Sequence, residues 1–213
     1  MHLKQHPLKL VVLISGRGSN LRAIQSAIET GTLHAHIVCV CANKASAEGL
    51  AYATEHGLNT AVVTPQKGEE RTTYDARLAK TVQPYSPDVI VLAGFMRILT
   101  SSFLSAFSCP ILNIHPALLP KYPGLDTHAR ALSAGDAEHG VTVHWVTAEL
   151  DAGPILAQAK LNIEEADTPD SLAARVLTLE HQLYPEVLRW FSEARIAMLK
   201  EGVVLKDGRP LSF

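Results

Sequence analysis

The strongest constraint on the fold is a repeating alternation of short apolar runs and amphipathic stretches along the chain. Leu8–Ile14 is a short, mainly apolar run that ends at Ser15-Gly16, which is typical of a central parallel strand. In the next stretch, 20–30, the apolar residues fall on one face of a helix, and Gly31 ends it. Strand followed by helix, repeated with short loops, predicts a parallel sheet with right-handed crossovers.

The same alternation continues along most of the chain. Strands are expected at 37–42, 60–63, 89–93, 111–114, 141–146 and 155–163, and helices at 46–56, 69–82, 127–134 and 169–194. Thr168 is the expected cap of the last helix, with Pro169 in its first turn. We therefore predict an α/β fold, with a doubly wound, mostly parallel sheet between two layers of helices (αβα).

The length of 213 residues fits one domain, so we predict a single domain over 1–213. Residues 1–8 are expected to be a flexible lead-in, and 195–213 a tail with a small hairpin at Asp207-Gly208. The sequence contains neither an apolar run of about 18 residues nor a signal peptide. The cysteines number three, an odd count that argues against a disulfide framework. A cytoplasmic location is therefore expected.

Charge indicates which partners to expect. Charged residues make up 19% of the chain, and the net charge is −2. Nucleic-acid binding usually requires a basic face and about 6–10 phosphate contacts, which this balance does not favour. We expect small-molecule substrates, with no nucleic acid and no membrane; both a monomer and a homodimer remain compatible with the sequence.

The first motif that could carry chemistry is the segment Ser15-Gly16-Arg17-Gly18-Ser19-Asn20, between the first strand and the first helix. Glycines allow close backbone approach, and a helix N-terminus offers free N–H groups, so the segment suits a phosphate. A dinucleotide fingerprint fails because Leu21 replaces its third glycine and Asn43 stands where an acidic residue should end the second strand. The alternative is a plain glycine-rich turn.

The second motif is Asn113-Ile114-His115-Pro116, at the end of a predicted strand. Asn113 and His115 are two residues apart, so both side chains point the same way from an extended chain. An amide donor beside an imidazole suits a developing oxyanion, although a histidine near a strand end is often structural.

The third motif is the acidic turn Glu149–Pro154. Asp151 is either an ordinary solvated turn residue or a partner that orients His115 and raises its pKa. A fourth segment places Arg97 among apolar residues, where it either grips a carboxylate or packs its stem. Histidine spacing does not predict a metal site: His34-x-His36 lacks an evident third ligand.

At these motifs the chain closely resembles the glycinamide ribonucleotide (phosphoribosylglycinamide) formyltransferases of purine synthesis. The resemblance runs from Leu10 to about Phe191. It rests on five segments in order: VVLISGRGSNL at 11–21, AGFMRIL at 93–99, NIHPALLPKYPG at 113–124, HGVTVH at 139–144 and ELDAGP at 149–154. It implies a Rossmann-like formyltransferase fold and transfer of a formyl group from 10-formyltetrahydrofolate to the ribonucleotide amine, without metal, NAD or ATP.

The resemblance also implies a role for individual residues. Asn113, His115 and Asp151 are implied as the catalytic trio that stabilises a tetrahedral intermediate. The residues implied to hold the ribonucleotide are Gly18, Ser19, Asn20 and Glu180. Those implied to contact the folate are Arg71, Met96, Arg97, Ile98, Leu99, Asn113, Thr147, Ala148, Glu149, Leu150 and Asp151. One departure is Leu177, which stands where some members of the family use a Gln near the phosphate.

Several alternatives remain at this point. A formyltetrahydrofolate hydrolase and a non-catalytic nucleotide or folate sensor share the same fold. Methionyl-tRNA formyltransferases have a related site but carry an additional C-terminal domain, for which we expect this chain to be too short. Formyltetrahydrofolate deformylases place a regulatory domain ahead of the core, and here the first strand already begins at Leu8.

Overall fold

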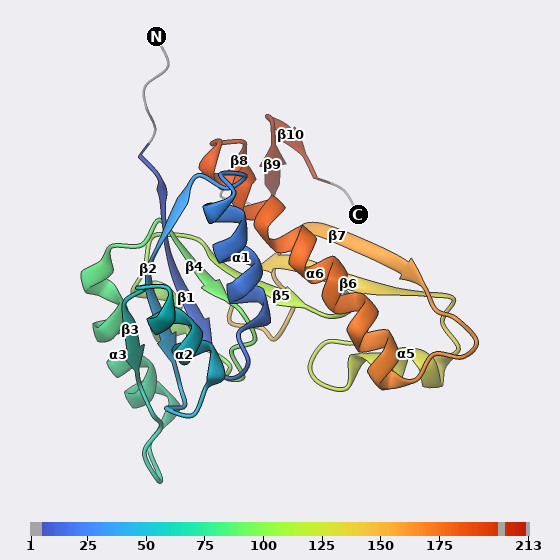
Figure 1. Cartoon of the computed structure of the whole chain (residues 1–213), viewed down its shortest axis with the longest axis horizontal. Coiled ribbons are helices and arrows are strands. Elements are labelled where there is room, and N and C mark those ends of the chain that lie inside the picture. Colours follow the sequence, from blue (N-terminus) through green and yellow to red (C-terminus); the bar gives the residue numbers. More distant parts are fainter. Residues whose placement is uncertain (1–5, 200–202, 212–213) are drawn as a thin grey trace. The chain divides into compact units, whose positions relative to one another are not determined.

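A computed structural model of the chain describes residues 6–199 and 203–211 (Figure 1). The chain divides into two compact units, Met1–Leu112 and Asn113–Phe213. The single domain expected over 1–213 stays a prediction, and each unit is considered in turn. Part of the expected lead-in, residues 1–5, lies outside the described residues, as do 200–202 and 212–213 of the expected tail.

The first unit alternates strands and helices as expected. Its elements are β1 (Leu8–Ile14), α1 (Ser19–Glu29), β2 (Ala35–Ala42), α2 (Glu48–Glu55), β3 (Thr60–Val62), α3 (Arg71–Val82), the 3-10 turn η1 (Gln83–Tyr85), β4 (Val89–Leu92), α4 (Ser101–Ser105) and β5 (Ile111–His115), which crosses the boundary. These bounds agree with the predicted ones to within about two residues. The exception is α4, which was not predicted because five residues are too short to show a helical period.

The core of the first unit is built around β1. This strand pairs in parallel with β2 on one side and β4 on the other, and β2 pairs in parallel with β3. Leu10–Ile14 are fully buried, as a strand covered on both faces requires. Helices α1 and α2 both contact β2. The carboxyl end of β1 therefore delivers the glycine-rich segment from a rigid centre.

The second unit continues with α5 (Thr127–Ala134), β6 (Glu138–Trp145), β7 (Ile155–Asn162), α6 (Pro169–Ser192), β8 (Ile196–Met198), β9 (Val204–Lys206) and β10 (Arg209–Pro210). Strands β6 and β7 pair antiparallel. Helix α6 runs along both of them, and α5 packs on α6 (Figure 1). Strand β6 is buried over most of its length, so polar side chains on it need partners.

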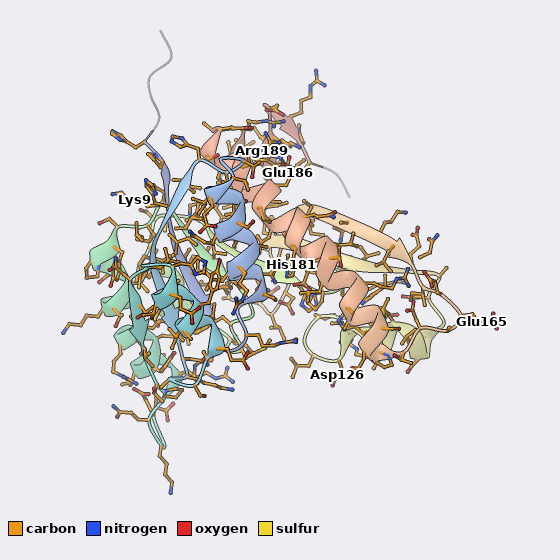
Figure 2. The ribbon with its side chains drawn as sticks, in the orientation of Figure 1. Lys9, Asp126, Glu165, His181, Glu186 and Arg189 are labelled. Carbon is orange, nitrogen blue, oxygen red and sulfur yellow. The ribbon has the colours of Figure 1, made fainter. Side chains whose placement is uncertain are left out.

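Helix α6 has well-defined ends. Thr168 caps its start: the Thr168 hydroxyl accepts from the Ser171 N–H, and the Ser171 hydroxyl accepts from the Thr168 N–H. Near the other end, labelled in Figure 2, Arg189 forms ion pairs with Glu186 and Glu193. The predicted cap at Thr168 is confirmed.

Hydrogen bonding orders seven strands β3-β2-β1-β4-β5-β6-β7 in one sheet. The sheet is mostly parallel, with an antiparallel β6–β7 pair, and helices flank it, so the predicted α/β class is confirmed. A second, three-stranded antiparallel sheet has the order β10-β9-β8. It includes the predicted hairpin, since Asp207 and Gly208 both have positive φ, and it adds β8.

None of the helices in the described part of the chain is long and apolar enough to cross a membrane.

Candidate active site

Two polar side chains on β5 start the site. Asn113 and His115 alternate with Leu112 and Ile114, so they project from the same face of the strand, as their spacing predicts. His115 is buried, with an exposed fraction of 5%. A buried imidazole requires hydrogen-bond partners, and these come from two loops of the same unit.

The first of these loops connects β6 to β7 and carries Asp151. Its backbone closes tightly: the Trp145 N–H donates to the Pro154 carbonyl at 2.9 Å. A Cβ at Gly153 would lie 1.8 Å from the Trp145 carbonyl oxygen, so only glycine fits there. Asp151 itself adopts a left-handed backbone, with φ 50°. The acidic turn is therefore a shaped loop that directs one carboxylate inward.

The structure brings Asn113, His115 and Asp151 together around one further histidine, His144 of β6. His115 Nδ1 lies 3.4 Å from Asp151 Oδ2. His144 Nε2 lies 3.6 Å from Asp151 Oδ1. Asn113 Nδ2 lies 3.1 Å from His144 Nε2. The proximity of Asp151 to His115, which the spacing of the sequence left open, is thus present.

His144 is the member of the cluster that the sequence-based prediction missed as a site residue. Its Nδ1 lies 3.0 Å from the Trp145 carbonyl, which can only accept, so Nδ1 carries the proton. Its Nε2 then accepts from the Asn113 amide and fixes the direction of that amide. The available signal was a second histidine on the same strand, five residues after His139.

Two backbone groups also hydrogen-bond to His115 and Asp151 and influence their protonation. His115 Nε2 donates to the Tyr122 carbonyl at 2.8 Å, and the Gly124 N–H donates to Asp151 Oδ2 at 2.9 Å. Burial lowers the pKa of His115 below its usual value, although the Tyr122 carbonyl and the Asp151 charge oppose that shift. Burial raises the pKa of Asp151, but the contacts with His144, the Gly124 N–H and His115 outweigh it and lower the pKa overall.

The glycine-rich segment lies in the first unit, where β1 leads into α1. Gly18 precedes the helix with φ 74°, a left-handed backbone. A Cβ on Gly18 would lie 2.9 Å from Gly49 Cα, so this turn packs directly on the start of α2. Ser19 begins α1, and Asn20 is buried. The first N–H groups of α1 are the kind of donors that bind phosphate.

The segment after β4 is tied to the same turn. The Met96 N–H donates to Ser15 Oγ at 2.8 Å. Met96 and Ile98 are exposed, by 66% and 45%, whereas Leu99 is 3% exposed. The Leu99 side chain therefore packs in the core. Arg97 stacks on the Tyr74 ring at 3.9 Å, and its Nε is buried without a hydrogen-bond partner.

The remaining predicted residues are distributed over both units. Arg71 is the first residue of α3 and is exposed. Thr147–Leu150 form the exposed part of the β6–β7 loop, with Leu150 49% exposed. Glu180 is half-buried on α6. The grouping of these residues into a ribonucleotide site and a folate site stays a prediction.

Within residues 6–199 and 203–211, no group of three or more metal-binding side chains is present. His128 and His139 approach each other, at 3.1 Å between Nδ1 and Nε2. Burial lowers the pKa of His139 to about 4 and also lowers that of His128. Between two neutral imidazoles, the N–H of one ring can donate to the bare nitrogen of the other, so a hydrogen bond accounts for the short distance.

Comparison with known proteins places the chain. Residues 8–188 match the family model described as Formyl transferase. The chain is 47% identical to the phosphoribosylglycinamide formyltransferase of Escherichia coli (strain K12), over 96% of each protein. It is 44% identical to that of Haemophilus influenzae, over 95% of each. The solved phosphoribosylglycinamide formyltransferase of Coxiella burnetii superposes with a TM-score of 0.92 at 50% identity, covering 97% of this chain and 96% of that one. The chain belongs to the formyl transferase family.

Proposed function

We propose that Asn113, His115 and Asp151 carry out formyl transfer in this chain. Its activity is that of a phosphoribosylglycinamide formyltransferase in purine biosynthesis. The formyl group passes from 10-formyltetrahydrofolate to the amine of N1-(5-phospho-D-ribosyl)glycinamide, in the branch that leads to IMP. The observation that supports the residue roles is the contact cluster in which His115 lies against Asp151, and His144 lies against both Asp151 and Asn113.

Two donors stabilise the charge that develops on the formyl oxygen. The Asn113 amide has two N–H groups, and His144 accepts one of them. The second N–H is directed by that bond and is available for the oxyanion. Protonated His115 supplies the other donor through Nδ1. Prepositioned donors of this kind are worth about 10²–10³ in turnover each.

Asp151 controls the proton on His115. With Nε2 bonded to the Tyr122 carbonyl, the nitrogen of His115 that gains and loses a proton is Nδ1, which faces Asp151. The carboxylate stabilises the imidazolium and, in the proposed reaction, orders a water that relays the proton from the attacking amine towards the leaving nitrogen N10. Because burial lowers the pKa of His115, its imidazolium is a stronger acid than an exposed one.

The ribonucleotide is assigned to Gly18, Ser19, Asn20 and Glu180. Backbone N–H groups at the start of α1 suit the phosphate. The folate is assigned to Arg71, Met96–Leu99 and Thr147–Asp151 together with Asn113. Exposed apolar side chains such as Met96, Ile98 and Leu150 suit a flat ring system, and a guanidinium such as Arg97 suits a carboxylate.

The proposed reaction uses neither a metal nor NAD nor ATP, because a formyl group is exchanged between two amide-like nitrogens. We also propose a cytoplasmic location and small-molecule partners only, with the chain working as a monomer or homodimer. The similarity to phosphoribosylglycinamide formyltransferases and the net charge of −2 support the small-molecule partners.

The test mixes the purified protein with phosphoribosylglycinamide and a 10-formyl folate whose deformylation changes absorbance. Turnover should require both substrates, and His115→Ala should lower kcat by about 10²–10⁴ with far smaller changes in KM. Deformylation without the ribonucleotide would instead indicate a hydrolase. Binding of both compounds without turnover would indicate a sensor. Near-normal turnover in His115→Ala would remove His115 from the mechanism.

A further inference from the structure

We propose that Asp136 is a positioning residue that acts through Tyr122 to orient His115 and set which of its nitrogens exchanges a proton. The proposal rests on the function proposed above for His115 and Asp151. It concerns the turn Tyr122–Leu125 and the two side chains that hold it, Asp136 just after α5 and Arg130 on α5.

The turn Tyr122–Leu125 contacts both members of the acid pair. The Tyr122 carbonyl accepts from His115 Nε2 at 2.8 Å, and the Gly124 N–H donates to Asp151 Oδ2 at 2.9 Å. A carbonyl can only accept, so it keeps a proton on Nε2 and leaves Nδ1 facing Asp151 at 3.4 Å. The position of this turn therefore decides how the pair holds its proton.

The backbone of Tyr122 needs an outside restraint to present that carbonyl. Tyr122 has φ 56°, a left-handed conformation that is strained for a bulky residue. Its ring leads away from His115, and its hydroxyl donates to Asp136 Oδ2 at 2.8 Å. This bond ties the strained residue at its far end.

Asp136 is well fixed for that task. It follows Gly135, which ends α5, and its N–H donates to the Ala131 carbonyl at 3.2 Å. Its carboxylate is 17% exposed. The hydrogen bonds from Lys121 and Tyr122 lower the pKa of Asp136, so it is ionised at neutral pH and is a strong acceptor. Lys121 is 60% exposed, and its ion pair contributes little.

A second anchor comes from α5 itself. Arg130 Nη1 donates to the Pro123 carbonyl at 2.7 Å and to the Leu125 carbonyl at 3.2 Å. Its guanidinium also lies 5.1 Å from the Tyr122 ring centre. Asp126, labelled in Figure 2, connects the turn directly to α5. The turn is thus held by the helix that follows it, at both its first and its last residue.

Other charged and titratable groups also act on His115, so the effect of Asp136 must be separated from theirs. They are Asp151, His144, Arg130, His128 and His139. In the described part of the chain, the Tyr122 hydroxyl donates to Asp136, and it forms no hydrogen bond with any of these five groups. A substitution that removes only this hydroxyl therefore leaves all five in place.

The experiment compares Tyr122→Phe, Asp136→Ala and the double variant in the full-length protein. Each single variant should lower kcat by about 10-fold and leave KM for both substrates within about two-fold. The reason is that His115 loses its orientation whereas the substrate-binding residues are unaffected. The double variant should be no worse than either single one, since both remove the same bond. Asp136→Asn retains an acceptor oxygen and should retain most of the activity.

A direct readout is the nitrogen NMR spectrum of His115 in isotope-labelled protein, followed with pH. The Tyr122 carbonyl raises the pKa of His115, so loosening it should lower that pKa, and the alkaline limb of kcat should move to lower pH. Lys121→Gln, which removes the other partner of Asp136, is the matched control and should match the wild type in both readouts.

Unchanged His115 resonances and an unchanged pH profile in Tyr122→Phe and Asp136→Ala would overturn the proposal, even if kcat fell. If Asp136→Ala does not fold, Tyr122→Phe decides alone, because it deletes one oxygen atom. His115→Ala belongs in the same series. If it keeps wild-type turnover, the proposed role of His115 fails. If His115→Ala loses its turnover while Tyr122→Phe and Asp136→Ala resemble the wild type, only the proposed role of Asp136 fails.

Discussion

The glycine-rich turn of the first unit and the polar cluster of the second are built in opposite ways. The turn relies on backbone: Gly18 sits against Gly49, and the N–H groups of α1 begin there. The cluster relies on side chains: His115 and Asp151 approach each other through their terminal atoms, and His144 links Asn113 to Asp151. Backbone N–H groups do not titrate, whereas imidazole and carboxylate do.

This difference matches what each part has to do. A phosphate has a fixed charge and is best held by donors that never change state. A proton that must move needs groups whose pKa values can be set, and burial provides that setting for His115 and Asp151. Substitutions in the glycine-rich turn should therefore affect binding, and those in the polar cluster should affect turnover.

The largest effect is expected from Asp151→Asn, which keeps the shape of the side chain but removes its charge. We expect kcat to fall by roughly 10²–10⁴, because the imidazolium loses its stabilising partner. The Asp151 charge raises the pKa of His115, so its loss should lower that pKa further. The acid form then disappears at lower pH, and the alkaline limb of kcat/KM should move to lower pH.

Steady-state kinetics over a range of pH would measure both effects. Asp88→Asn, at a carboxylate that accepts from the Lys9 N–H, is the matched control and should leave both unchanged. A pKa of His115 that rises in Asp151→Asn would contradict the assigned sign.

The next effect tests the backbone turn. In Gly18→Ala the new Cβ meets Gly49 Cα, and the left-handed backbone adds strain, so we expect KM for the ribonucleotide to rise roughly 10- to 100-fold. The value of kcat at saturation should change much less. Gly57→Ala, at a glycine with φ 69° and open space around it, should lose stability but keep its KM.

If Gly18→Ala lowered kcat and left KM unchanged, the division between a glycine-rich turn for binding and a polar cluster for turnover would be wrong.

A third prediction concerns the support of the cluster. The fully buried Thr142 hydroxyl donates to the Ala117 carbonyl and accepts from the Leu119 N–H and the Gln158 amide. Thr142→Val removes this partner from the Ala117 carbonyl and the Leu119 N–H, whereas the Gln158 amide keeps its bond to the Leu119 carbonyl. The free energy of unfolding should therefore fall by about 1–3 kcal/mol. Denaturant titration would measure it, with Thr142→Ser as a control that keeps the hydroxyl. Equal losses in both would point to lost packing instead.

The smallest effect is expected at Leu177. If a side-chain donor there reaches the phosphate, as the resemblance implies, Leu177→Gln should lower KM for the ribonucleotide by up to about 10-fold. That is the effect expected from one additional hydrogen bond. Leu177→Met changes shape without adding a donor and should have no such effect. An unchanged KM in Leu177→Gln would indicate that the backbone turn suffices.

Much of the fold could be predicted from the sequence because its signals are local. The apolar run of β1, the turn glycines and the cap at Thr168 depend on neighbours a few residues away. The short helix α4 and strand β8 were missed because neither is long enough to show a period. Asn113 and His115 were placed on one face because a strand has a period of two.

The chain's own residues therefore determined an α/β sheet, a glycine turn where β1 leads into α1, and an amide–imidazole pair on β5. Tertiary structure alone decided that His144, which lies 31 residues beyond Asn113, orients the side-chain amide of Asn113. It also decided that the carbonyl of Tyr122, in its strained turn, accepts a hydrogen bond from His115 Nε2. The physical reason is that these contacts depend on how loops close, and loop closure follows from packing across the whole unit, which no short stretch of sequence encodes.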